Sequence, residues 1–137
     1  VNKLGRGSVI FCALPDLLGE DERMTPFVAH MLAHLFTGAT PVKVDGEVEY
    51  LINRNERGWV VTLINNRGVL KPQQGLAQVD RSAKVEVRLS LKGNQIAQAN
   101  EWVDDKRLEV ASENSQSSVR LALAPGAIAV VELVEKR

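Results

Sequence analysis

The pattern of hydrophobic and polar positions changes once along this chain, close to Gly38. Before that point, in residues 25–36, apolar side chains recur at helical spacing. After Thr40 they alternate with polar ones or form short continuous runs, which are the two patterns typical of β-strands. The sequence therefore predicts a short N-terminal segment containing a helix, followed by a mainly β domain.

The N-terminal segment begins with a continuous apolar run over residues 8–15, which predicts a short strand in a parallel sheet covered on both faces. Thr25 and Pro26 have the residue types of a helix N-cap and first turn, and Gly38 is a typical stop. The helix between them has one broad apolar face, made of Phe27, Val28, Met31, Leu32, Leu35 and Phe36. A helix must bury such a face, so we expect it to form an interface, with Phe27, Met31 and Leu35 at its centre.

The β region is organised around residues 58–66, an apolar run that predicts a central strand buried on both faces. Residues 41–44 and 47–53 are predicted strands, joined in a hairpin across Asp45 and Gly46. Residues 71–82 form a predicted polar loop that is long enough to cross from one sheet to another.

The second half of the β region alternates most regularly over residues 83–91. There the pattern points Val85, Val87, Leu89 and Leu91 inward and Lys84, Glu86, Arg88 and Ser90 outward. Weaker strands are expected over 95–103 and 106–111, then a polar loop over 113–118, and further strands over 119–123 and 127–134. We predict an antiparallel β-sandwich of about seven or eight strands over residues 39–137, preceded by the strand and amphipathic helix of residues 1–38.

Composition narrows the possible partners and compartments. Basic and acidic residues number 17 each and are interspersed, which argues against nucleic acid or an anionic membrane as partner. No apolar run approaches the roughly 20 residues of a membrane span. Cys12 is the only cysteine, so no internal disulfide is expected and the cellular location stays undecided. Because the chain begins at Val1 without an initiator methionine, we expect it to be a fragment of a longer protein.

Two stretches resemble parts of family-42 β-galactosidases, which are large glycoside hydrolases. Residues 5–11 (Gly-Arg-Gly-Ser-Val-Ile-Phe), Leu14-Pro15 and the helix to Phe36 look like the closing strand and helix of their flavodoxin-like domain. Residues 48–51 (Val-Glu-Tyr-Leu), residues 58–66 (Gly-Trp-Val-Val-Thr-Leu-Ile-Asn-Asn) and a final strand after Ala124-Pro125-Gly126 look like their C-terminal β-sandwich.

The resemblance implies a non-catalytic accessory domain at the C-terminus of a carbohydrate-active protein. It would stabilise that protein or mediate contacts with its other domains or with a second subunit. The family's catalytic glutamates lie on a separate barrel, so the resemblance assigns no catalytic residue and no cofactor here. The first strand and helix would lack the rest of their parent sheet and would need cover from elsewhere.

The main alternative is a carbohydrate-binding module, which would attach the parent protein to a polysaccharide. Trp102 and Tyr50 are the candidate residues, because an aromatic ring can stack on the apolar face of a sugar. Trp102 stands in a polar context and is expected to be exposed, whereas Trp59 opens the central strand and is expected in the core.

A small independent enzyme is a third possibility. His30 and His34 have the i, i+4 spacing of two metal ligands, but no further histidine exists to complete a site. Glu47 with Glu49, and Asp104 with Asp105, could form carboxylate pairs for glycoside hydrolysis, although acidic residues at such positions more often form a solvated edge. We therefore predict neither a metal site nor catalytic residues.

Overall fold

The structure, a computed structural model, describes residues 2–5, 7–9, 25–36, 40–93, 95–113 and 116–136. The chain divides into two compact units, Val1–Ala39 and Thr40–Arg137. Within the described residues, no helix has the length and apolar character needed to span a membrane.

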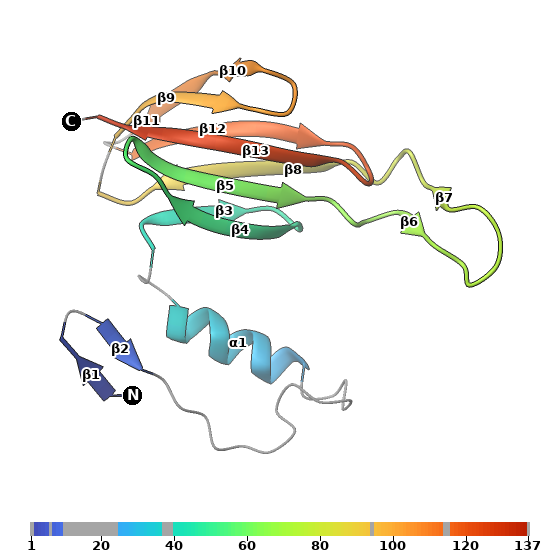
Figure 1. Cartoon of the computed structure of the whole chain (residues 1–137), viewed down its shortest axis with the longest axis horizontal. Coiled ribbons are helices and arrows are strands. Elements are labelled where there is room, and N and C mark those ends of the chain that lie inside the picture. The colour runs from blue at the N-terminus through green and yellow to red at the C-terminus, as the bar shows by residue number, and fades with distance from the viewer. Residues whose placement is uncertain are drawn as a thin grey trace. The chain divides into compact units, whose positions relative to one another are not determined.

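The first unit contains a hairpin and one helix (Figure 1). Helix α1 (Thr25–Phe36) confirms the helix predicted from the apolar spacing. Strands β1 (Asn2–Leu4) and β2 (Gly7–Val9) pair antiparallel around a turn at Gly5. The prediction of a parallel-sheet strand is therefore wrong for residues 8 and 9, because the tight turn gives β2 its preceding strand as a partner. Residues 10–15 of that predicted strand, and the predicted stop at Gly38, lie outside the described residues.

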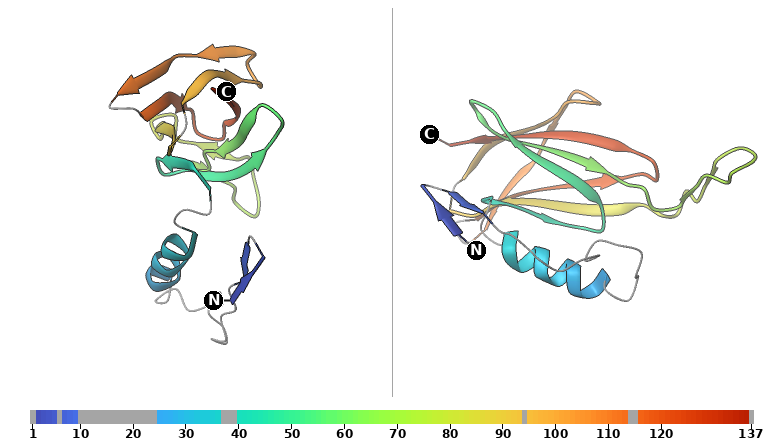
Figure 2. Two further views of the ribbon diagram at one scale, coloured as in Figure 1. Left: turned by 90° about the vertical axis from the view of Figure 1, so that its left-hand side faces the viewer. Right: turned by 60° about the horizontal axis from the view of Figure 1, so that its bottom comes forward.

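The second unit is built from two antiparallel sheets, which confirms the predicted mainly β fold. Figure 2, left, views this unit nearly along its strands and shows the two sheets facing each other. The five-stranded sheet has the order β10 (Lys106–Leu108), β9 (Ile96–Glu101), β13 (Ile128–Glu135), β5 (Gly58–Ile64) and β4 (Glu49–Arg54). The four-stranded sheet has the order β11 (Val110–Glu113), β12 (Gln116–Leu123), β8 (Val85–Leu91) and β3 (Val42–Asp45).

The core lies between these sheets and is made by alternate residues of each strand. The four residues predicted to face inward from β8 are buried, and they pack in one cluster with Val61, Leu63, Val131 and Leu133. Ser90 was expected to be exposed, and this is wrong, because only 2% of it is accessible. Its short side chain lies between Lys43 and Ser118 on the neighbouring strands.

The middle of the five-stranded sheet is β13, and the predicted central strand β5 lies beside it. The prediction that β5 is buried on both faces is wrong, because only one of its faces is buried. Val61 and Leu63 have no accessible surface, whereas Val60, Thr62 and Ile64 on the other face are half-buried. A continuous apolar run predicted two covered faces, but no second layer of the sandwich lies over the outer side of this sheet.

The predicted hairpin across Asp45 and Gly46 does not form. Strand β3 pairs with β8 and β4 pairs with β5, so this turn carries the chain from one sheet to the other. Gly46 has φ 141°, and a Cβ there would stand 2.8 Å from the backbone oxygen of Glu86. Close packing of the turn against β8 therefore competes with the tight hairpin that an Asp-Gly pair favours.

The predicted loop of residues 71–82 does cross between sheets, from β5 to β8, but it is not without structure. Strands β6 (Val69–Leu70) and β7 (Gln78–Val79) pair antiparallel. They form a hairpin of residues 69–79, here called the arm, which projects beyond the ends of both sheets (Figures 1 and 2). The polar loop predicted over 113–118 is also shorter than expected, because β12 already begins at Gln116 and buries Ser117 and Ser118.

Candidate docking surface

Exposed large hydrophobic side chains gather at one end of the sandwich. This is the end where β5 and β9 finish, where β4 and β13 start, and from which the arm projects (Figure 1). We call it the apolar end. Eight such residues of the second unit lie there, namely Tyr50, Leu51, Leu70, Leu76, Val79, Trp102, Val103 and Ile128.

Part of this surface is a row across the outer face of the five-stranded sheet. The register places Leu51, Thr62 and Val130 opposite one another on β4, β5 and β13. The backbone N–H of Trp102 donates to the carbonyl oxygen of Val130 at 2.8 Å, which extends the row to the end of β9. Because Val61, Leu63 and Val131 point into the core, strand alternation puts this row on the outer side.

A buried carboxylate holds the turn that carries Trp102 and Val103. One oxygen of Glu101 accepts the backbone N–H groups of Val103 and Val130, at 2.9 and 3.1 Å. The other oxygen accepts the N–H of Asp104 at 2.7 Å. Glu101 thus satisfies three donors that the end of the strand leaves without ladder partners, and it fixes the position of Trp102 at the sheet edge.

The arm carries the most exposed apolar residue of the sandwich. Leu76 stands between β6 and β7 with 90% of its surface accessible, and Leu70 and Val79 are exposed on the two strands. The base of the arm is held by hydrogen bonds. The N–H of Asp80 donates to the Gly68 carbonyl oxygen at 2.8 Å, and the Ser82 hydroxyl and N–H both donate to one Asp80 carboxylate oxygen, at 2.6 and 2.9 Å.

These hydrogen bonds predict a pH dependence at the base of the arm. The Ser82 hydroxyl, and then its backbone N–H, lower the pKa of Asp80 from its ordinary value of 3.8. A carboxylate with a lowered pKa stabilises the fold above its ordinary pKa and loses that contribution as the pH falls through the lowered value. The amide resonance of Ser82 should titrate with a midpoint below 3.8, and Asp80→Asn should abolish the titration. A midpoint at or above the ordinary value would contradict this assignment.

A cavity of about 490 Å³ opens between the two sheets at the apolar end. Most of its lining is apolar, including Leu108 of β10, Leu121 and Leu123 of β12, and Ala127 and Ala129 near the start of β13. The exposed pair of Asp104 and Lys106 also lines it, as does the buried Glu101, whose carboxylate is already satisfied by three backbone N–H groups. The cavity is therefore suited to an apolar side chain.

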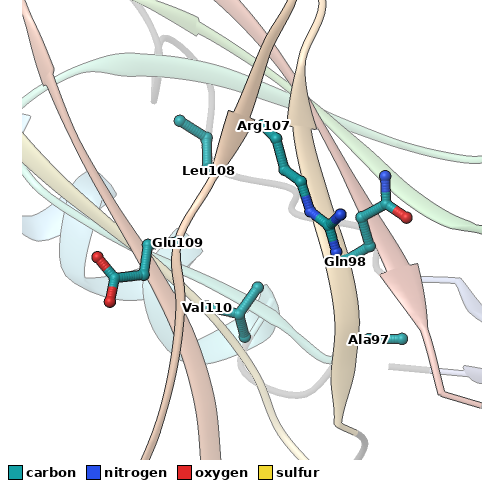
Figure 3. A pocket seen from close by; sticks show the side chains of 6 residues that line it. All are labelled: Ala97, Gln98, Arg107, Leu108, Glu109 and Val110. Carbon is teal, nitrogen blue, oxygen red and sulfur yellow. The ribbon is translucent and has the colours of Figure 1, made fainter.

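A second hollow, of about 440 Å³, lies along β9 and the connection from β10 to β11 (Figure 3). The side chains of Gln98 and Arg107 lie close together there, whereas the carboxylate of Glu109 points away from them. The ionisable groups that line this hollow do not converge on one point, so its geometry offers no acid–base pair.

Beyond the outer row, toward the opposite end of the sandwich, the outer face of the five-stranded sheet is polar. Glu132 is almost fully buried, and its carboxylate accepts the side-chain amides of Asn55 and Asn100, at 2.9 and 3.2 Å. Arg57 lies 3.4 Å from the same carboxylate. Trp59, which was expected in the core, is half-buried and packs against the core cluster. Its indole N–H donates to Glu135 at 3.0 Å. The two ends of the molecule therefore present different chemistry to a partner.

The structure does not bring Trp102 and Tyr50 together. Each is 51% accessible, but Tyr50 lies on the edge strand β4 and Trp102 at the end of β9, with β5 and β13 between them. Tyr50 is opposite the inward-facing Leu63, whereas Trp102 belongs to the outer row. The two rings therefore cannot form one stacking platform.

Three of the acidic candidates, Glu47, Glu49 and Asp104, have partners of their own. Glu47 forms an ion pair with Arg67, and Glu49 accepts the side-chain amide of Asn66 at 2.8 Å. Asp104 accepts the ammonium of Lys106 at 2.6 Å, and this hydrogen bond, together with the opposite charge, raises the pKa of Lys106. All of these side chains are exposed, so the pairs contribute little stability.

The helix residues are described only in part. Phe27 and Leu32 are exposed, Met31 is half-buried and Val28 is buried. His30 is exposed, whereas the side chains of His34 and Leu35 lie outside the described residues. In the part of the chain that the structure describes, no three His, Cys, Asp or Glu side chains are placed to hold a metal ion.

Sequence reasoning missed the arm as a surface feature. Four large apolar residues interrupt its polar sequence, Val69, Leu70, Leu76 and Val79, and this was the available signal. Comparisons with protein-family models, with curated proteins and with solved structures each gave no match. The resemblance to family-42 β-galactosidases therefore stays a prediction, and function is argued from the surface.

Proposed function

We propose that this chain is a non-catalytic accessory domain that docks through its apolar end onto another domain of the same protein or onto a second subunit. The observation that carries the proposal is the gathering of eight exposed large hydrophobic residues at that end. Scattered exposed leucines are ordinary on a protein surface, whereas a contiguous apolar region is typical of an interaction site.

The magnitudes indicate which part of the surface must be engaged. Fully burying an exposed aliphatic side chain contributes about 2 kcal/mol, so Leu70, Leu76 and Val79, which are 67%, 90% and 51% accessible, together contribute about 4 kcal/mol. Association of free partners costs roughly 4–15 kcal/mol in lost translational and rotational freedom. The arm alone is therefore marginal, and stable docking needs the outer row with Leu51, Trp102 and Ile128 as well.

The kind of parent protein is supported by the sequence resemblance. A carbohydrate-active parent, similar to a glycoside hydrolase, would use such a domain to stabilise its catalytic barrel or to join subunits. The reading frame that encodes this chain should then also encode a barrel, and the isolated chain should hydrolyse no aryl glycoside. A complete reading frame without a barrel would contradict this part of the proposal.

Substitutions on the arm test docking directly. In the parent protein, the combined change of Leu70, Leu76 and Val79 to serine should lower the melting temperature or weaken subunit association, because docking loses about 4 kcal/mol of apolar burial. The matched control changes Lys92, Glu113 and Arg120 to serine, which are also exposed but are not apolar. Equal behaviour of the two triple variants would contradict a docking role for the arm.

A second candidate function is carbohydrate binding through Trp102. Alternation puts Trp102 and Asn100 on one face of the strand, about 7 Å apart. The Asn100 amide is held in place, because its oxygen accepts from Gln98 at 2.7 Å and its nitrogen donates to Glu132. An exposed ring beside an ordered amide can stack on a sugar and bind its hydroxyls.

Affinity gels containing a soluble polysaccharide distinguish this second function. If it holds, the chain is retarded, Trp102→Ala abolishes the retardation, and Tyr50→Ala on the opposite face leaves it unchanged. Retardation that survives Trp102→Ala, or none with any polysaccharide tested, would speak against a carbohydrate-binding role for this residue.

A further inference from the structure

The apolar end carries both a projecting side chain and a cavity able to receive one. Leu76 lies in the loop between β6 and β7 of the arm, and the cavity lined by Leu108, Leu121 and Ala127 opens between the sheets at the same end. An interface between two identical chains related by a two-fold axis requires a self-complementary surface. A projection and a matching cavity on one surface satisfy that requirement.

We propose that two copies of this chain exchange arms, with Leu76 of each copy entering the cavity between the sheets of the other. This inference rests on the proposed docking function and names a second copy as the partner. It assigns a different task to each part of the surface: the arm supplies the anchor, the cavity receives it, and the turn at Trp102 and Val103 borders the contact.

The arm is not placed to insert Leu76 into the cavity of its own chain. Its base is fixed by the hydrogen bonds of Asp80 with Gly68 and Ser82, and it projects beyond the sheets (Figure 1). Val79 pairs with Val69 in the arm, so the three steps from Val79 to Leu76 let Leu76 reach at most about 11 Å beyond this pair, which is enough to enter a hollow on a molecule packed against this end. Leu76 is 90% accessible, so its apolar surface is open to a partner.

The polar groups at the contact are compatible with this arrangement. Gln73 and Gln74 precede Leu76 on the arm, and their uncharged amides can both donate and accept hydrogen bonds. The edge of the cavity offers Asp104 and Lys106, which are exposed and paired with each other. The approach of the arm therefore leaves no charge buried without a partner.

The oligomeric state of the complete 137-residue chain tests the proposal. Sedimentation equilibrium at up to about 100 µM should show a dimer, and Leu76→Asp should raise its dissociation constant at least about 100-fold, because two symmetric contacts are lost together. Below the dissociation constant of the dimer, the wild-type and Leu76→Asp chains should have the same melting temperature, since Leu76 is not part of the core. A dimer that persists in Leu76→Asp would overturn the arm contact.

Cysteine pairing tests the geometry without relying on affinity. In a Cys12→Ser background, a chain with Leu76→Cys is mixed with a chain carrying Ala127→Cys, and oxidation should produce a disulfide between the two. The control mixes Leu76→Cys with Lys92→Cys, and should give no such product. A third variant carries both Leu76→Cys and Ala127→Cys in one chain. If its oxidation gives only a disulfide within the chain, and the mixed chains give none between them, the exchange is overturned.

Failure of this inference and failure of the docking function give different results. If the chain stays monomeric and forms no cross-link, the second copy is not the partner. If the serine variant of the arm still destabilises the parent protein in that case, the docking function holds with another domain as the partner. If neither assay responds to the arm, both proposals are overturned.

Discussion

Replacing Gly58 with alanine is expected to lower the free energy of unfolding by about 4 kcal/mol. Gly58 starts β5 with φ 155°, a conformation that favours glycine. A Cβ there would stand 2.1 Å from the backbone oxygen of Leu133 and 3.0 Å from the backbone nitrogen of Glu135. Both atoms belong to β13, the middle strand of its sheet, so relief requires moving the backbone and breaking ladder hydrogen bonds.

Denaturation of the complete chain in urea measures this loss, with Gly93→Ala as the matched control. Gly93 also has a positive φ, of 81°, but a Cβ there meets nothing within 4 Å. The control should therefore cost only the conformational penalty of about 1 kcal/mol. Equal losses for the two variants would show that contact with β13 is not the cause.

Replacing Asn65 with leucine is expected to cost about 3 kcal/mol although the two side chains are similar in size. Asn65 follows β5 and has no accessible surface. Its amide nitrogen donates to the carbonyl oxygens of Ala83 and Leu123, at 3.1 and 3.0 Å, and its amide oxygen accepts the N–H of Arg67 at 3.0 Å. It thereby joins the end of β5 to the end of β12 and to the segment just before β8, and leucine would leave these groups without that partner.

The neighbouring Asn66 provides the control for this second prediction. It is exposed, and its amide donates to the exposed Glu49. Asn66→Leu should therefore change the free energy of unfolding by no more than about 0.5 kcal/mol. Thermal and urea unfolding of the two variants would settle the comparison, and a loss of less than about 1 kcal/mol for Asn65→Leu would contradict a bridging role.

Local pattern was sufficient for several elements. The helix over residues 25–36 and the inward set of β8 follow from the period of the apolar residues, and both agree with the structure. Strand pairing was harder to predict from the sequence. The Asp45-Gly46 pair favoured a hairpin by its local chemistry, but packing against Val87 of β8 gave the two adjoining strands different partners.

The candidate site was less predictable than the fold. The exposure of Trp102 was expected from its polar neighbours, but its separation from Tyr50 depends on strand order and register. The docking surface was expected on the helix, through Phe27, Met31 and Leu35, whereas the largest gathering of exposed hydrophobic residues that the structure describes belongs to the sandwich and its arm.

By itself the sequence determined where strands and the helix form and which side chains of a strand share a face, because both depend on the spacing of residues along a few turns or pleats of backbone. Only the tertiary structure decided which strands pair and which faces stay uncovered. It also decided that Leu76, Trp102 and Ile128 lie at the same end of the sandwich. Those outcomes depend on contacts between distant residues, and a hydrophobic side chain has the same identity in the sequence whether another layer covers it or not.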